Sequence, residues 1–409
     1  MRSTNHRLKQ LGIVGLSLVV FAVGWLVVSA RIDMNKETNS SAKHSTATSP
    51  SQSSSSAKSD KIRLIATGDM LPHDTVNQAA HTTSGYDYLP LFTKVAPFLK
   101  DADIAYCNQE SPSASQFRVS GYPTFNAPIS FAHDLSTLGC NMINLANNHA
   151  NDRGQAGITA TRHVWDGLPT LAVAGTARTP AEQKQISIFR KGDITFAFLS
   201  YAKCSNSHLA NSYGVNILSR SLVSTQIKAA RTAGAQMIIV GTHWCHENTS
   251  QQDADQNTWA AYLASQGVDI VIGTGPHWLQ PVKQLPKAGG GTTLVWFSLG
   301  NFLSSQLEIN GLIGGIAVME IDAASHSVSS VGFMPTYMHY EWTAAQQAHG
   351  DLLARHNLMI YPLDQAADAL AQSQNHTTVS TQTTRVTKLL NTYMPVQMLT
   401  SRTFTTFGQ

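Results

Sequence analysis

Side chains able to bind metals or transfer protons recur in the sequence just after short apolar runs. Asp69 follows the first run, and Glu110 follows the second. Amide, imidazole and carboxyl groups take similar positions further along the chain, at Asn148, His149, Asp152, His243, Glu247 and His277. Carboxylate, amide and imidazole groups are the ligands that hard to borderline divalent cations prefer. Together they predict a divalent metal centre or another polar catalytic site.

Each of these residues, taken singly, also has an ordinary structural explanation. Asp69 after a glycine is typical of a turn or a helix cap. His243 beside Trp244 is compatible with a packed core imidazole. The functional interpretation is favoured because the residues coincide at successive strand ends.

The apolar runs alternate with helical patterns, which is typical of an α/β fold. The runs cover residues 62–67, 103–108, 141–146, 193–200, 236–241 and 268–273. The helical patterns cover Leu89 to Leu99, Ser130 to Leu138, Gln155 to Asp166, Ser221 to Ala233 and Gln251 to Gln266. Because sites in open α/β sheets form outside the carboxyl ends of strands, we expect the polar residues to share one cleft.

The later part of the sequence has a different pattern. After Thr293 it becomes rich in strand-like segments, which predicts additional antiparallel strands. We assign residues 61–340 to the folded domain and the less periodic residues 341–409 to a C-terminal extension. The polar stretch from Gln372 to Thr384 is predicted to be a surface loop or partly disordered.

The N-terminal residues predict a membrane anchor. Residues 11–30 are uncharged and about the 20 residues long that a membrane-spanning helix needs. Basic residues in 1–10 predict a cytoplasmic tail and place the chain after Ala30 outside the cell. A cleaved signal peptide is the alternative, since Val28-Ser29-Ala30 resembles a processing site. Ten of the thirty residues 31–60 are serine, which predicts a flexible linker.

Composition limits the partners and the ligands. A net charge of +3, without a Lys/Arg block, argues against nucleic acid binding. Sixteen histidines against four cysteines predict nitrogen and oxygen ligands. The cysteines lack CxxC spacing, which argues against a zinc knuckle or a disulfide scaffold; one or two disulfides stay open, with no pairing favoured.

Seven motifs in one order resemble the bacterial capsule synthesis protein CapA family, which includes poly-γ-glutamate synthesis proteins. The motifs are GDM (68–70), NQE (108–110), TFNAP (124–128), NLANNHANDRGQAG (144–157), HWCHEN (243–248), GTGPHWLQ (273–280) and FSLGNF (297–302). The family is similar to calcineurin-like metallophosphatases. The resemblance implies a four-layer sandwich of two mixed β-sheets flanked by helices, here preceded by one transmembrane helix.

The resemblance also implies roles for the polar residues. The implied ligands of a divalent cation (Mn, Fe, Zn or Mg) are Asp69, Glu110, Asn148, His243 and His277. His149 is the implied acid or substrate-orienting group, and Asp152 and Glu247 join it as candidate catalytic residues.

This sequence departs from the family pattern at three positions. Cys245 replaces a usual glycine, Gly275 replaces a usual histidine, and Asn126 stands where an arginine facing an anionic substrate is common. His246 or Cys245 could substitute for the missing histidine. We expect one tightly bound divalent ion or none, and replacing Gly275 with histidine should raise the metal content if the loop has room.

Two functions of different classes follow from the resemblance. The first is a membrane-anchored, extracellular capsule synthesis or export protein that hydrolyses or transfers phosphoester or amide bonds of an anionic, poly-γ-glutamate-type polymer. The second is a non-catalytic polymer-binding or scaffold subunit that assembles with other capsule synthesis membrane proteins. The two functions differ in whether the protein is an enzyme.

Overall fold

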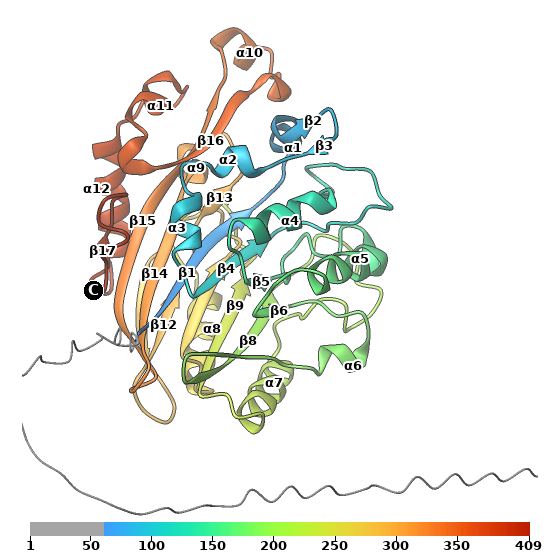
Figure 1. The fold of residues 1–409 in the computed structure, drawn as a ribbon, viewed down its shortest axis with the longest axis vertical. Helices are drawn as coiled ribbons and strands as arrows, with labels where there is room; N and C mark the ends of the chain where they lie inside the picture. The colour runs from blue at the N-terminus through green and yellow to red at the C-terminus, as the bar shows by residue number, and fades with distance from the viewer. Residues whose placement is uncertain (1–60) are drawn as a thin grey trace, which may run out of the picture. The chain divides into compact units, whose positions relative to one another are not determined.

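The computed structural model describes residues 61–409, which form two β-sheets packed face to face (Figure 1). The predicted membrane span at 11–30 and the serine-rich linker at 31–60 lie outside the described residues. Within residues 61–409, no helix is both long and apolar enough to cross a membrane.

The larger sheet is mixed, with a parallel half and an antiparallel half. Its main path runs in the order β16 (His356–Pro362), β15 (Ser327–Glu341), β14 (Ile313–Asp322), β1 (Lys61–Met70), β4 (Ile104–Gln109), β5 (Met142–Asn144) and β6 (Ala172–Ala174). Two further strands pair outside this path, β13 (Asn301–Leu303) with β1 and β17 (Gln397–Met398) with β15. Strands β1, β4, β5 and β6 run parallel to one another, so their carboxyl ends meet at one edge.

The smaller sheet has a parallel centre and antiparallel edges. Its order is β11 (Val282–Pro286), β12 (Thr292–Trp296), β10 (Ile270–Thr274), β9 (Met237–His243), β8 (Ile194–Ala202) and β7 (Ser187–Lys191). A separate two-stranded ribbon is made by β2 (His81–Thr82) and β3 (Gly85–Tyr86).

Twelve α-helices and two short 3₁₀ turns connect these strands in the described part of the chain. The α-helices are α1 (Asp74–Ala80), α2 (Leu89–Phe92), α3 (Ala96–Lys100), α4 (Ile129–Thr137), α5 (Gly154–Asp166), α6 (Pro180–Gln183), α7 (Arg220–Thr232), α8 (Ala254–Ser265), α9 (Ile309–Leu312), α10 (Ala344–Ala348), α11 (Ala367–Gln372) and α12 (Val379–Leu390). The 3₁₀ turns are η1 (Leu352–Ala354) and η2 (Leu363–Gln365).

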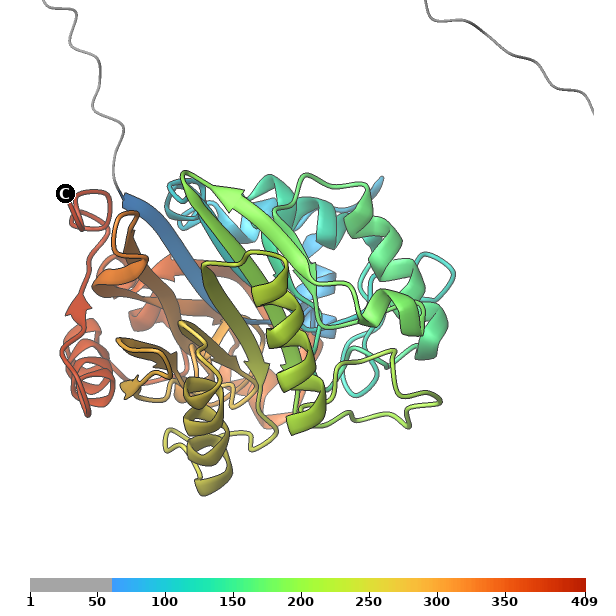
Figure 2. The same ribbon diagram turned by 90° about the horizontal axis from the view of Figure 1, so that it is seen from below.

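Alternating apolar side chains on β8 show how the layers are built. Because neighbouring side chains of a strand point to opposite faces, one set can fill the space between the sheets and the other can face outward. Phe196 and Phe198 belong to the core between the sheets, where Phe198 meets Tyr106 of β4 at 5.9 Å between ring centroids. Leu199 and Tyr201 belong to a second cluster with α7 and α8. Figure 2 shows α7, in yellow-green, lying over the strands of this sheet.

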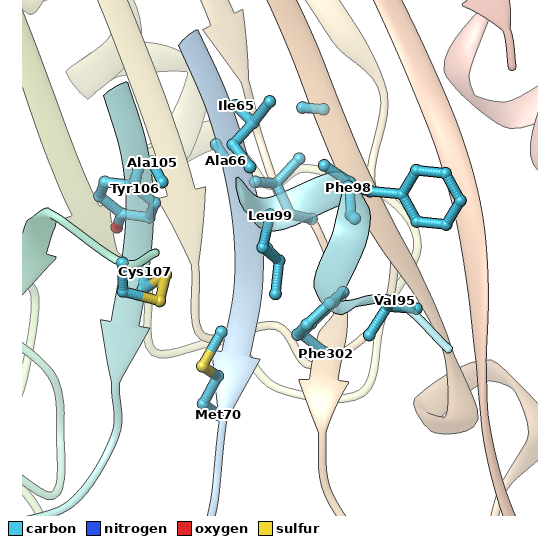
Figure 3. Packing of buried hydrophobic residues seen from close by; sticks show 14 of the residues in the cluster. Ile65, Ala66, Met70, Val95, Phe98, Leu99, Ala105, Tyr106, Cys107 and Phe302 are labelled. Carbon is cyan, nitrogen blue, oxygen red and sulfur yellow. A yellow bond between two sulfur atoms is a disulfide. The ribbon is translucent and has the colours of Figure 1, made fainter. Parts of the chain in front are cut away.

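The outer face of the larger sheet is covered in the same way. Leu99 of α3 lies beside β1, whereas the ring of Phe98 points away from β1 (Figure 3) and meets Phe404 edge-on at 5.0 Å between ring centroids. Phe131 of α4 joins the same cluster. The order helix, sheet, sheet, helix is therefore the layered mixed α/β arrangement that the resemblance implied.

Two local predictions are wrong. The pattern from Leu89 to Leu99 is not one helix but two, α2 and α3, because Pro97 lacks an N–H and would clash with the carbonyl four residues earlier. The stretch from Gln372 to Thr384 is not a loop throughout. From Val379 it forms α12, capped by the Thr378 side chain and anchored by buried side chains that include Val386.

Residues 341–409 add strands to the larger sheet. β16 pairs with β15 in antiparallel register, and β17 pairs with β15 in parallel. Phe404 and Phe407, near the C-terminus, are buried in the main apolar cluster. The core of the described domain is therefore completed by residues far along the chain.

Candidate metal centre

The carboxyl ends of parallel strands from both sheets bring a buried acidic and imidazole group together. Asp69 lies at the end of β1, Glu110 directly follows β4, and His277 follows β10. One potential ligand atom from each of the three lies within 4.8 Å of the other two, and all three residues are buried. Among the described residues, this is the one group of His, Cys, Asp or Glu with that spacing.

His243, the last residue of β9, completes the buried cluster. Its Nε2 lies 3.5 Å from Glu110 Oε1, and its Nδ1 lies 3.9 Å from Asp69 Oδ1. His277 approaches the same carboxylates, with Nδ1 3.1 Å from Asp69 Oδ2 and Nε2 4.0 Å from Glu110 Oε1. Each carboxylate therefore faces both imidazoles.

Asn148 joins this group through Glu247. Its Nδ2 donates to Glu247 Oε1 at 3.3 Å, and that oxygen lies 3.9 Å from His277 Nε2. Four of the five ligands implied by the family resemblance therefore contact one another directly, and Asn148 is linked to them through Glu247.

Several buried polar atoms at the centre have no hydrogen-bond partner. They are both carboxylate oxygens of Glu110, Nε2 of His243 and Oδ1 of Asn148. A buried polar atom without a partner costs roughly 1–3 kcal/mol, so such atoms are rare unless something else binds them. Oxygen and imidazole nitrogen atoms are suitable ligands for a divalent cation. The residues present therefore fit a metal ion.

The backbone at His277 also has an unusual conformation. Its φ of 61° lies in the left-handed region, which non-glycine residues adopt rarely. Such conformations concentrate at functional sites, where the surrounding structure imposes them. Here the conformation directs the imidazole to Asp69 and Glu110.

Burial and neighbouring charges separate the protonation states of the group. Burial, with the nearby Asp69 carboxylate, raises the pKa of Glu110 well above its usual value. Burial is the largest influence on Asp69 and acts to raise its pKa. The hydrogen bond and charge of His277, with the charge of His243 and the Gly275 N–H, together outweigh burial, so the net shift of this pKa is downward. Burial lowers the pKa of His243 to about 3, which leaves a neutral imidazole able to bind a metal.

A chain of buried amides fixes Asp69 from behind. Asn108 Nδ2 donates to Asp69 Oδ1 at 2.8 Å, and Asn144 Nδ2 donates to Asn108 Oδ1 at 2.9 Å. The Ser200 hydroxyl of β8 donates to Asn144 Oδ1. Sequence reasoning did not assign Asn108 or Asn144 to the site. The usable signal was an asparagine inside each of two predicted strands, at positions that pair across β4 and β5.

His149 and Asp152 form a second unit beside the ligands. His149 Nδ1 lies 2.7 Å from Asp152 Oδ2, which also accepts a hydrogen bond from Phe125 N at 2.7 Å. The Phe125 ring packs edge-on against the imidazole of His149, with 4.5 Å between the ring centroids. Asn206 Nδ2 lies 3.3 Å from His149 Nε2. The two residues are thus arranged as an imidazole oriented by a carboxylate.

The structure answers the questions raised by the departures from the family pattern. Gly275 has φ +100°, and a Cβ built there would lie 2.0 Å from the Trp244 carbonyl oxygen. The loop therefore has no room for a histidine side chain at this position, and the condition for a gain in metal content is not met. His246 does not replace the missing imidazole, because its side chain is 63% exposed and its Nδ1 lies 3.3 Å from Asp253 Oδ2.

Cys245 and Asn126 have structural roles. Cys245 is bonded to Cys204, so it offers no thiolate to a metal. Asn126 is buried and bonds only to backbone atoms of its own loop, those of Ala114, Phe117 and Arg118. It does not substitute for an arginine that faces an anionic substrate.

The fold and the site define a mixed α/β protein with a buried centre suited to a divalent cation. The chain belongs to the family described as "Bacterial capsule synthesis protein PGA_cap", which it matches over residues 63–306. This confirms the resemblance found in the sequence.

Two curated relatives agree with this assignment. The chain is 24% identical over 263 residues to "Capsule biosynthesis protein CapA" of Bacillus anthracis, covering 61% of each protein. It is 26% identical over 226 residues to "PGA biosynthesis protein CapA" of Bacillus subtilis (strain 168), covering 53% of this chain and 57% of that protein. The matches thus span about three fifths of these relatives.

Two solved structures show distant similarity. One is a phosphatase from Mycoplasma pneumoniae, with a TM-score of 0.44 at 12% identity, covering 67% of this chain and 93% of the other. Another is a 5′-nucleotidase precursor from Thermus thermophilus, with a TM-score of 0.40 at 13% identity, covering 67% of this chain and 54% of the other.

Proposed function

We propose that this protein is a membrane-anchored, extracellular capsule synthesis protein whose metal centre assists hydrolysis or transfer at a phosphoester or amide bond. The observation that carries the proposal is the buried group of ligand atoms without hydrogen-bond partners at Glu110, Asn148 and His243. Family membership supplies the capsule context. An anionic polymer of the poly-γ-glutamate type is the proposed substrate class.

The ligand set and the His149–Asp152 pair have separate tasks in this proposal. A bound divalent cation would lower the pKa of water and polarise the oxygen of the phosphoryl or carbonyl group that is attacked. Because Nδ1 of His149 donates its hydrogen bond to Asp152, Nε2 of the same imidazole is the atom left to give or take a proton. Asn206 lies at that atom, so the reacting group of the substrate would displace its amide.

The reaction is tested with the full chain purified in detergent and supplied with Mn²⁺. A chromogenic phosphodiester and poly-γ-glutamate are assayed in parallel, with EDTA and Glu110→Ala as controls. We expect turnover of one of them that both controls abolish. Mn²⁺ binding without turnover of either substrate would instead support the polymer-binding or scaffold function.

Replacing His149 with glutamine is expected to slow the reaction while leaving metal binding intact. Loss of a positioned proton donor or acceptor costs about 10²- to 10⁴-fold in rate. His149 approaches Asp152 and Asn206 rather than the Asp69 and Glu110 carboxylates. The measurements are kcat and the dissociation constant for Mn²⁺. An unchanged kcat would remove His149 from the mechanism.

The cysteines support the proposed location of the folded domain outside the cell. All four are joined, as Cys107–Cys140 and Cys204–Cys245. Disulfides persist in oxidising compartments such as the cell exterior and are rare in the cytosol.

The location is tested by fractionation and external protease. We expect the full chain in the membrane fraction, with residues from Asp60 onward accessible to protease added outside the cell. A mature protein that starts near Arg31 and is released into the medium would contradict the anchor.

A further inference from the structure

Gly275 leaves one side of the metal centre without a side chain. Its N–H donates to both Asp69 oxygens, at 3.0 and 3.2 Å, so the backbone itself lies against the carboxylate. A Cβ at this position would also lie 3.0 Å from Nε2 of His243. The family's usual histidine therefore has no counterpart at this place in the chain.

The loop of residues 244–248 occupies the space next to Gly275. Trp244 N donates to Thr274 O, and Asn248 N donates to Pro276 O, each at 2.8 Å. Asn248 has φ 57°, a left-handed conformation that asparagine tolerates and that turns the chain here. The loop is thus bonded on both sides of Gly275, in a position that a side chain there would prevent.

This close approach brings Glu247 to the centre. Its Oε1 lies 3.3 Å from Asn148 Nδ2 and 3.9 Å from His277 Nε2. The side chain is 43% exposed, so it reaches the centre from the solvent side while Asp69 and Glu110 are buried. The hydrogen bond from Asn148 Nδ2 also leaves Asn148 Oδ1, which has no partner, as the amide atom available to a cation.

Neighbouring side chains do not offer the missing ligand. His246 is turned to Asp253, and Cys245 is held in a disulfide. The Thr274 hydroxyl lies 3.0 Å from Nδ1 of His243 and 3.4 Å from the Thr242 carbonyl oxygen, so it is already bonded. Apart from His277, already counted among the ligands, Glu247 is the carboxylate or imidazole side chain left on the 244–248 loop and the turn at Gly275.

We propose that Glu247 is a metal ligand in this protein, on the side of the centre where Gly275 supplies no side chain. The inference rests on the proposed metal centre and assigns Glu247 a binding role instead of the catalytic one suggested by the sequence. A carboxylate in place of an imidazole makes the centre richer in oxygen and favours harder cations such as Mn²⁺ or Mg²⁺ over Zn²⁺.

The test measures Mn²⁺ binding by calorimetry and metal content by elemental analysis, on the full chain in detergent. Glu247→Gln keeps an oxygen that can accept from Asn148 but removes the charge. It is expected to raise the dissociation constant for Mn²⁺ by about ten-fold or more, the size of effect known for residues around metal sites. His246→Ala, one residue away in the same loop, is the matched control and should change it less than two-fold.

A third variant separates binding from orientation. If Glu247 only orients Asn148, Glu247→Ala weakens Mn²⁺ binding but Glu247→Gln matches wild type, and the ligand assignment is overturned. Melting temperatures in EDTA, expected to be unchanged in all three variants, show that the metal-free fold is intact. Wild type that binds no Mn²⁺ would overturn the metal centre itself, whereas binding that is equal in wild type and all variants would overturn only the role of Glu247.

Discussion

Replacing Gly275 with histidine is expected to destabilise the protein and lower its metal content, not raise it. The new Cβ would lie 2.0 Å from the Trp244 carbonyl oxygen, in a backbone with φ +100°. A left-handed conformation costs a side chain about 1–2 kcal/mol, and forcing atoms into a packed site adds about 1–3 kcal/mol. The clash would push the 244–248 loop away and take Glu247 with it. Urea unfolding in EDTA measures the loss of stability, and elemental analysis measures the metal.

Gly234→Ala is the control for the backbone strain alone. Gly234 has φ +88°, close to that of Gly275, but no atom lies within 4 Å of a Cβ built there. It should lose only about 1–2 kcal/mol and keep its metal. A Gly275→His protein as stable as wild type that holds an additional ion would show that the loop opens freely and that our interpretation of its packing is wrong.

The layers of this fold could be predicted from its apolar runs. The strand around Ile65, the strand around Phe198 and the helix that begins after Ser219 are local patterns with local causes. The approximate place of the site followed from the same patterns, because parallel strands end together. Asp69 and His243 are therefore neighbours although they come from different sheets.

Contacts between distant parts of the chain could not be predicted in this way. A single sequence does not show that Cys107 faces Cys140, since four cysteines allow three pairings. Nor does it show that the turn at Gly275 lies under the carbonyl of Trp244. The packing of Gly275 against Trp244 is what links the absence of a side chain at position 275 to the approach of Glu247 from the 244–248 loop.

Removing the Cys204–Cys245 disulfide is expected to affect both stability and the site. The bond closes a loop with a sequence separation of 41 residues, and disulfides of this kind contribute about 2–4 kcal/mol. Cys245 belongs to the loop that carries Glu247. Cys204 begins the segment in which Asn206 N donates to Asn148 O at 2.8 Å and Asn206 Nδ2 meets His149 Nε2. Cys204→Ser/Cys245→Ser should therefore be less stable, bind Mn²⁺ more weakly and lose order at His149.

The Cys107–Cys140 disulfide provides a matched comparison within the same molecule. Its sequence separation is 33 residues, so Cys107→Ala/Cys140→Ala should lose a similar free energy of unfolding. Cys107 precedes Asn108 on β4, and consecutive side chains of a strand point to opposite faces, so this bond lies on the side of the sheet away from Asp69. Urea unfolding should give similar losses for the two double variants, whereas calorimetry with Mn²⁺ should show weaker binding only without Cys204–Cys245. Equal Mn²⁺ affinities in the two variants would mean that the loops around the metal centre hold their positions without the covalent bond.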